Sequence, residues 1–307
     1  MFEQTLAAIT HLDAATMDKC QVRLDNLSKP LNSLLYFERL ARQLAGITGN
    51  PRPPQGLTKS LLLFTAKPLS ADLPATIVSG SAPINAFAAH VQAPVSVRSL
   101  ADAPAAVGRE LCLYYLEQGI KAAQAQAAKG IAILGLDALD QDSETAGAQL
   151  VAWCQASPDA VPNYLLDPHT ADPLLVLERL ADPALTAMTG ALLGAAAAKT
   201  AVVLDGVAAD AAAFLATRFA PQVKEYLIGS HLSTAPAHPD ALKLIGMPVH
   251  LDLRLSVGQG VGAAMSMILI NAALHVLNDM KTFGDAGVAV AQDGPGALKQ
   301  RHDVRDE

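Results

Sequence analysis

The chain has 307 residues, of which 51% are hydrophobic and 17% charged, and its formal net charge is −7. This length suffices for one large α/β domain or two modest ones. The acidic balance excludes the basic surface that nucleic acid requires, so we expect no nucleic-acid partner. Alanine dominates and aromatic residues make up only 4%, which is typical of Ala-rich helices packed closely on a sheet.

Cysteine usage and the apolar stretches bear on the cellular compartment. Cys20, Cys112 and Cys154 form neither a metal-ligand pattern nor a disulfide framework, so we expect no metal site and a reducing, cytoplasmic compartment. The opening residues contain acids and lack a continuous apolar core, so they predict no secretory signal. Residues 257–277 carry no formal charge and are long enough to span a bilayer, but their three glycines and several polar residues favour a buried helix of a soluble protein.

The predicted elements alternate between helix and strand along the chain. Apolar residues at helical spacing predict an amphipathic helix at 33–49, which glycines end. Beyond it we expect strands at 59–66, 93–100, 131–136, 201–206, 223–231 and 248–255. We expect helices within 79–90, 107–130, 145–156, 169–200, 207–221 and 240–246, and a final helix after the glycine loop at 258–262.

Strand, loop and helix repeated in this way predict an α/β fold with a parallel sheet flanked by helices. Ligands of such sheets bind beyond the carboxyl ends of the strands. The loops of interest therefore follow five predicted strand ends, at Ala66, Leu136, Leu204, Ile228 and Leu255.

Several stretches together resemble one enzyme family. They are LDNLSKPLNSLLYFERLARQLAGITG near the start, SGSAPINAFA, then VLDGVAADAAAFLATRFAPQVKEYLIGSHLSTAPAH and LDLRLSVGQGVGAAMSMILINAALHVLNDMKTFGDAGV toward the end. In order and spacing they resemble the signatures of the nicotinate mononucleotide:dimethylbenzimidazole phosphoribosyltransferases. The resemblance covers both ends of the chain and most of its length.

The resemblance implies a fold, a reaction and an assembly. The family moves phosphoribose from nicotinate mononucleotide onto a benzimidazole in cobamide biosynthesis, and some members are heterodimers of homologous chains that use phenol or p-cresol. It implies a large α/β domain, here residues 57–262, and a small helical bundle from the chain ends, here residues 1–56 and 263–307. It implies dimers with the bundle near the partner's active site. We expect no cofactor and no membrane association.

Gln259 departs from the family at the position that matters most for chemistry. The family's G-E-G loop carries a catalytic glutamate, and Gln259 occupies its place between Gly258 and Gly260. An amide has no accessible pKa and cannot take the acceptor's proton, and loss of a general base typically lowers the rate about a hundred- to ten-thousand-fold. The alternative interpretation of Gln259 is a helix-cap residue without a role.

The loop that cradles the nucleotide phosphate in the family is acidic here. In place of G-E-M-G-I-G-N-T-T the chain has GLDALDQDSETAGAQL, which aligns Asp140 and Asp142 with the loop glycines and Ser143 and Glu144 with the N-T pair, while Ala138 replaces the loop glutamate. A carboxylate at ~6 Å repels a phosphate by roughly 3 kcal/mol per unit-charge pair at an effective dielectric of 20. The acids also have a structural interpretation, in which they cap the helix that they begin.

Two further departures weaken the nucleotide site, although part of the pocket is retained. Lys67 and Pro68 stand where the family has Asp and His, and the chain lacks the G-T-x-N-F and G-R-G-T-G-x-D segments. The retained substrate-binding positions are Asp205, His231, Ser233, Gly258 and Gly260. For Asp205 and Ser233 the alternative is structural, with Asp205 capping its loop and Ser233 in a turn.

These observations favour a non-catalytic subunit that supports a homologous catalytic partner in a heterodimer. The first alternative is an active homodimer with a displaced base, supplied by Asp252, Asp205 or an acid of residues 137–144. The second is a small-molecule binding protein without turnover. A dinucleotide-dependent oxidoreductase is poorly supported, because GQGVGA lies near the end of the chain and no βαβ unit follows it.

Overall fold

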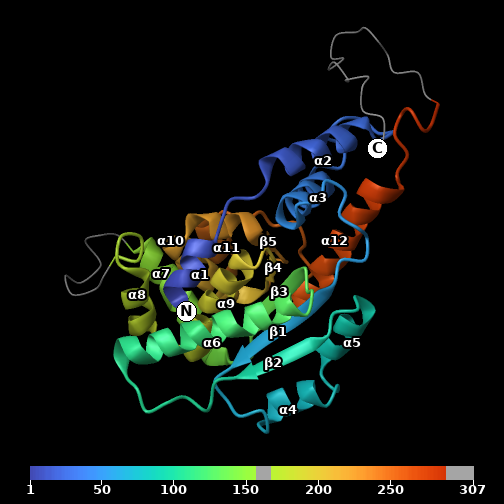
Figure 1. The fold of residues 1–307 in the computed structure, drawn as a ribbon. Helices are drawn as coiled ribbons and strands as arrows, with labels where there is room; N and C mark the ends of the chain where they lie inside the picture. Colours follow the sequence, from blue (N-terminus) through green and yellow to red (C-terminus); the bar gives the residue numbers. More distant parts are fainter. Residues whose placement is uncertain (157–166, 288–307) are drawn as a thin grey trace. The chain divides into compact units, whose positions relative to one another are not determined.

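The computed structural model describes residues 1–156 and 167–287 (Figure 1). The chain divides into two compact units, a larger one of residues 1–11 and 57–268 and a smaller one of residues 12–56 and 269–307. Residues 288–307, the last part of the expected bundle segment 263–307, lie outside the described residues.

A five-stranded parallel sheet forms the centre of the larger unit, in the order β2-β1-β3-β4-β5. Every residue of β1, β3 and β4 is buried, as expected of parallel strands that helices cover on both faces. The predicted α/β class is therefore confirmed. The strands are β1 (Lys59–Thr65), β2 (Val95–Ser99), β3 (Ile133–Ala138), β4 (Ala201–Leu204) and β5 (Leu227–Gly229).

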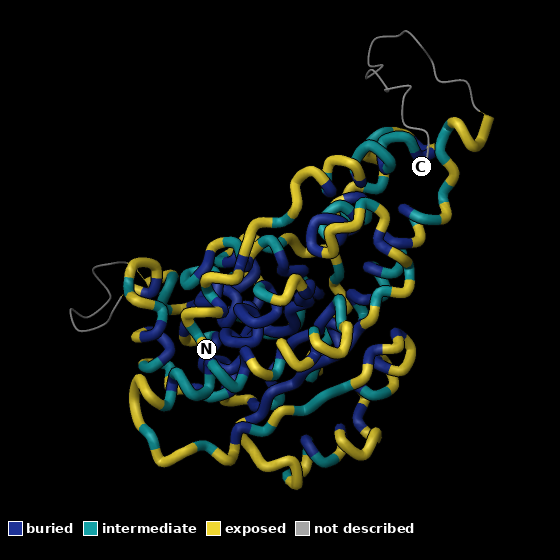
Figure 2. Tube along the Cα trace, viewed as in Figure 1, coloured by how far each residue is buried: buried dark blue, intermediate teal, exposed yellow. Residues whose placement is uncertain are grey.

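Helices connect the strands, and the buried residues concentrate where they meet the sheet (Figure 2). Helices α6 (Gly108–Ala128) and α9 (Pro183–Ala197) approach each other closely. A Cβ at Gly119 would overlap the Ala187 carbonyl oxygen, and one at Gly190 would overlap the Leu116 carbonyl oxygen. The helices of this unit are α1 (Phe2–Ala8), α4 (Asp72–Val78), α5 (Pro83–His90), α6 (Gly108–Ala128), α7 (Gln141–Gln155), α8 (Pro173–Leu180), α9 (Pro183–Ala197), α10 (Gly206–Phe219), the 3₁₀ helix η1 (Pro221–Tyr226) and α11 (His238–Ile245).

Three local predictions were wrong. Residues 248–255 form no strand; instead Leu232 makes a single bridge to Asp252, because the edge strand β5 has only three residues and offers a short pairing edge. The expected strand at 223–231 is reduced to β5, and the 3₁₀ helix η1 precedes it. The expected loop after β1 contains the helix α4.

The smaller unit is helical. It contains α2 (Ala14–Asn26), α3 (Leu35–Thr48) and the end of α12 (Val261–Asp279), which begins in the larger unit. Its core includes Cys20, Leu24 and Leu277, and a buried ion pair joins Lys29 Nζ to Glu38 Oε1 at 2.8 Å.

Residues 1–11 pack within the larger unit, whereas the sequence grouped them with the bundle segment 1–56. Phe2 makes an edge-to-face contact with Phe219, and the Tyr226 hydroxyl donates to the Thr10 carbonyl at 2.9 Å.

Helix α12 is the one helix of the described chain that is long and apolar enough to cross a membrane. In its most apolar 18-residue window 56% is buried, and a core helix of a soluble protein passes the same test.

Burial raises the pKa of each of the three cysteine thiols to about 12, so they behave as small apolar side chains.

Candidate functional site

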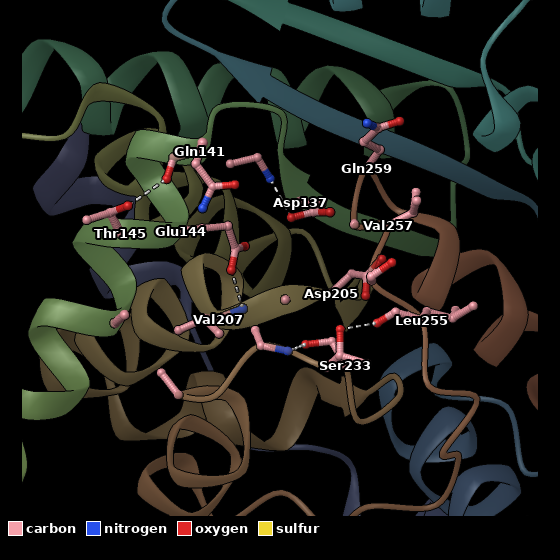
Figure 3. A pocket seen from close by; sticks show the side chains of 18 of the residues that line it. Asp137, Gln141, Glu144, Thr145, Asp205, Val207, Ser233, Leu255, Val257 and Gln259 are labelled. Atoms are coloured by element: carbon pink, nitrogen blue, oxygen red, sulfur yellow. Dashed lines mark hydrogen bonds between the residues drawn. The ribbon is translucent and has the colours of Figure 1, made fainter.

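A cavity of about 510 Å³ lies at the carboxyl ends of the central strands (Figure 3). Its walls come from the segments that follow β3, β4 and β5 and from residues 255–259 before α12. This is the edge of a parallel sheet at which ligands bind. Of the predicted site residues, Asp205, His231, Ser233, Gly258 and Gln259 line it, whereas Gly260 does not.

Asp205 joins three elements at the base of the cavity. It follows β4 and is fully buried; one carboxylate oxygen accepts the Gly262 N–H of α12 at 2.9 Å, and the other accepts the Ser230 hydroxyl at 3.2 Å. The same oxygen lies 3.1 Å from His231 Nδ1. A Cβ at Gly262 would overlap both His231 and Asp205, so only glycine allows this approach. Asp205 does not cap its own helix α10; instead it binds the beginning of α12.

Asp137 lies beside Asp205, and the sequence analysis named it only as one of the acids of residues 137–144. It belongs to β3 and is 1% exposed; one oxygen accepts the Gly260 N–H at 2.9 Å and the other accepts the Ala138 N–H at 2.7 Å. Burial, followed by the charges of Asp205 and Glu144, raises the pKa of the Asp137 carboxyl well above its usual value. The signal available in the sequence was an acid directly after the apolar run 131–136.

Glu144 caps a helix other than its own. From α7 its two oxygens accept the backbone N–H groups of Val207 and Ala208 at 3.3 and 3.4 Å, at the beginning of α10. Gly206 has φ +85, and a Cβ there would lie 2.7 Å from the Glu144 carboxylate. Helix N-termini of this kind bind anions, so a carboxylate of the chain itself occupies an anion-binding position. Burial raises the pKa of Glu144, and its two backbone hydrogen bonds oppose the shift.

The other residues of the acidic loop have different partners from those expected. Asp140 lines the cavity, but its oxygens accept from Thr65 Oγ1 at 2.9 Å and from the Ala66 N–H at 2.6 Å, and they make no cap for α7. Asp142 is exposed and does not line the cavity. Asp142 lies in the first turn of α7, where the structural interpretation of the acidic loop places it, and the helical phase of α7 directs it to solvent. The Ser143 hydroxyl donates to Asp182 at 3.0 Å.

Two positions considered in the sequence lie apart from the cavity. Asp252 is exposed, 3.6 Å from Arg254 Nε, and does not line the cavity. Lys67 is also exposed and outside the lining.

Ser233 is held by a buried chain of polar groups. Its hydroxyl lies 2.7 Å from His238 Nδ1, which also accepts the Ser233 N–H at 2.9 Å. His238 Nε2 lies 3.2 Å from Asp210 Oδ2, and both side chains are 1% exposed. Because Nδ1 accepts a backbone N–H, the ring proton is on Nε2 and faces Asp210. Although desolvation lowers it, hydrogen bonding to Asp210 and nearby charges raise the pKa of His238. Asp210 was detectable in the sequence as a lone acid in an Ala-rich helix.

Gln259 adopts the left-handed backbone conformation, with φ +65, between Gly258 and Gly260. Its amide oxygen is buried and has no hydrogen-bond partner among the described residues. Figure 3 shows this amide pointing away from Asp205 and Ser233. Gly260, with φ +84, packs against Leu63 and Ile84. The loop therefore brings a hydrogen-bonding amide, and no titratable group, to this side of the site.

Comparisons with known proteins converge on one activity. A family described as phosphoribosyltransferase matches residues 9–162 and 159–288. The nicotinate-nucleotide–dimethylbenzimidazole phosphoribosyltransferase of Geotalea uraniireducens is 30% identical over 350 aligned positions, covering 94% of this chain and 98% of that protein. The Geobacter sulfurreducens enzyme of the same name is also 30% identical, with the same coverage. An alignment of 350 positions exceeds the 307 residues of this chain, so the relative contains segments that this chain lacks.

Solved structures of enzymes from the same family are also similar to this chain. The nicotinate-nucleotide–dimethylbenzimidazole phosphoribosyltransferase from Thermus thermophilus superposes with a TM-score of 0.77 at 27% identity, covering 91% of this chain and all of that one. A structure of CobT from the same organism gives a TM-score of 0.75 at 26% identity, covering 90% and 99%.

Proposed function

Because the chain belongs to the family of nicotinate-nucleotide–dimethylbenzimidazole phosphoribosyltransferases, we propose that it is a subunit of such an enzyme in the cytoplasm. The complete enzyme transfers phosphoribose from nicotinate mononucleotide to a lower-ligand base, phenol, p-cresol or a benzimidazole, in cobamide biosynthesis. This chain lacks an active site of its own and supports a homologous catalytic chain in a heterodimer.

The observation that carries this proposal is the contact between Glu144 and α10. Backbone N–H groups at a helix beginning bind phosphate. The beginnings of α7 and α10 both line the cavity, and at α10 the N–H groups of Val207 and Ala208 already donate to the Glu144 carboxylate. Asp137 and Asp205 add two acidic side chains to the same cavity. A phosphate placed there meets three acids instead of free N–H donors, so this subunit does not hold the nucleotide.

Proton transfer supports the same conclusion. Displacement at the ribose anomeric carbon requires a base that takes the proton of the acceptor, and Gln259 cannot act as one. The acids offered as substitutes differ in their placement. Asp137 and Glu144 line the cavity, but the oxygens of both already accept backbone N–H groups. Asp252 lies outside the cavity, and Asp205 has both oxygens engaged by Gly262, Ser230 and His231.

A supporting subunit explains why the scaffold persists while these groups are lost. An oligomer requires the surface of each chain even where one pocket is idle. In this proposal the partner carries glutamate in the G-E-G loop and provides the base, and this chain provides a dimer face and part of the wall around the partner's site.

The test is to assay release of nicotinate from nicotinate mononucleotide, with phenol or dimethylbenzimidazole as acceptor. The chain is expressed alone and together with a homologous chain that carries the intact loop. We expect turnover by the pair that exceeds turnover by the partner alone, and none by this chain alone. Turnover by this chain alone would establish the homodimeric alternative, and an unchanged rate with no co-purification would establish a separate binding protein.

A further inference from the structure

Strand β2 forms one edge of the sheet and pairs only with β1. The Leu61 N–H donates to the Pro94 carbonyl at 2.9 Å, and the Leu100 N–H donates to the Thr65 carbonyl at 2.8 Å. Alternate residues of a strand direct their backbone groups to opposite sides, so the even-numbered residues of 94–100 face β1. The outward-pointing N–H and C=O groups have no hydrogen-bond partner within residues 1–156 and 167–287. They belong to Val95, Val97 and Ser99.

This edge lacks the features that usually prevent a strand from pairing with another chain. Such features are proline, lysine, a β-bulge or a covering segment. Strand β2 contains no proline or lysine, and its register with β1 runs from Val95 to Ser99 without a bulge. The Arg98 guanidinium donates to Gln118 Oε1 on α6 at 2.7 Å, so it lies over one face of the sheet and not across the edge. The backbone edge is therefore open to pairing.

Apolar residues are exposed on the two helices that lie beside β2 (Figure 1). Val78, which ends α4, is 64% exposed, and Phe87 of α5 is 37% exposed. A groove of about 430 Å³ lies between α5 and the beginning of β2, with Ala88, Gln92 and Val95 among its walls. Exposed apolar residues grouped beside an open strand indicate a protein-binding surface.

A second copy of the same edge fits these outward backbone groups. When two identical strands pair antiparallel about a two-fold axis at Val97, this residue meets its own counterpart, and Val95 meets Ser99 of the second copy. All three outward residues are then paired, and Arg98 faces Ser96 of the second copy. An axis at Arg98 would leave Val95 without a partner on the strand and would oppose two arginines directly. The register that pairs most backbone groups is thus also the one that separates the charges.

We infer that β2 is an interface between two copies of this chain, which pair antiparallel through residues 95–99 about a two-fold axis at Val97. The pairing joins the two sheets into one, and the exposed apolar residues of α4 and α5 flank the junction. This interface is separate from the heterodimer proposed above, so in the complete enzyme it joins two heterodimers through their non-catalytic chains. Because the strand has only five residues, the contact is small, and we expect association in the micromolar range. Its failure would leave the result of the paired-subunit assay unchanged.

The test introduces one cysteine on the strand of the full chain, followed by mild oxidation. Opposite residues of a hydrogen-bonded antiparallel pair have Cα atoms about 5.5 Å apart, within the range of roughly 4.4–6.8 Å that a disulfide spans. Val97→Cys should therefore form a covalent dimer on a denaturing gel without reductant. Ser99→Cys is the matched control on the same strand, because its counterpart lies about 13 Å further along the pair. We expect about tenfold more covalent dimer for Val97→Cys than for Ser99→Cys or for wild type.

Val97→Pro gives a second measurement. Proline removes the outward N–H at the axis but no hydrogen bond to β1, so the sheet should keep its fold, which circular dichroism checks. In sedimentation, the average mass of wild type should rise with concentration by a step that Val97→Pro lacks. The inference is overturned if Val97→Cys gives no more covalent dimer than Ser99→Cys, or if Val97→Pro associates as wild type does. Loss of the covalent dimer when the catalytic homologue is added would assign this edge to the homologue and would also overturn the inference.

Discussion

Substitution of Glu144 provides the sharpest test of the proposal that this chain does not hold a nucleotide. The Glu144→Ala substitution removes the carboxylate that accepts the Val207 and Ala208 N–H groups. It leaves α10 with free donors at its beginning, next to Gly206, whose missing Cβ allows an anion to approach. We therefore expect the variant to offer a phosphate free N–H donors at this helix beginning.

The magnitude follows from charge and geometry. A carboxylate at ~6 Å from a phosphate contributes roughly 3 kcal/mol of repulsion per unit-charge pair at an effective dielectric of 20, or about a hundredfold in affinity. The two hydrogen bonds of Glu144 are long, so we expect loss of the cap to lower the free energy of unfolding by only about 1 kcal/mol. Asp137 and Asp205 remain, so absolute affinity stays weak even though the gain is large.

The assay is calorimetric titration of inorganic phosphate and nicotinate mononucleotide into wild type and variants. Glu144→Ala should bind both ligands at least about tenfold more tightly than wild type, after allowance for screening by solvent. Glu144→Gln removes the charge but keeps an oxygen on the N–H groups, so its gain should be smaller. If Glu144→Ala binds no better than Asp142→Asn, the explanation by an occupied anion position is refuted.

Three other outcomes are expected. Gln259→Glu should not give the lone chain nucleotide binding or turnover, because Glu144 still occupies the N–H groups of α10; measurable nucleotide binding by this variant would contradict that reasoning. Gly262→Ala should lower the free energy of unfolding by about 2 kcal/mol or more in denaturant titrations, since its Cβ would overlap His231. The control is Gly284→Ala, whose Cβ would have its nearest atom at 3.7 Å. This control should leave the free energy of unfolding nearly unchanged. The pKa of Asp137 in the folded state lies well above the ordinary 3.8, so the folded state retains a proton that the unfolded chain has released. The free energy of unfolding therefore falls as pH rises from about 3.8 through the folded-state pKa. Asp137→Asn should flatten this decline, and an unchanged dependence of the unfolding free energy on pH would refute the assignment.

The sequence by itself determined the class of fold, because alternation between helical and strand periodicity is a local property of the chain. Strands β1 to β4 and helices α3, α6, α9 and α10 lie where the pattern predicts them. The glutamine in place of a catalytic base is likewise a property of one position. The strand expected at 248–255 failed because pairing depends on a neighbouring edge, and β5 supplies only three residues.

Only the tertiary structure decided which acids meet in the cavity. Residues 137–144 were apparent as an acidic stretch, but the phase of β3 and α7 sends Asp137 and Glu144 inward and Asp142 to solvent. Asp205 is linked to α12 rather than to its own helix, and Glu144 to α10. The sequence shows which side chains are acidic. The groups that neutralise or repel each acid come from segments that are distant in the chain, and their proximity sets the pKa and hydrogen bonding of that acid.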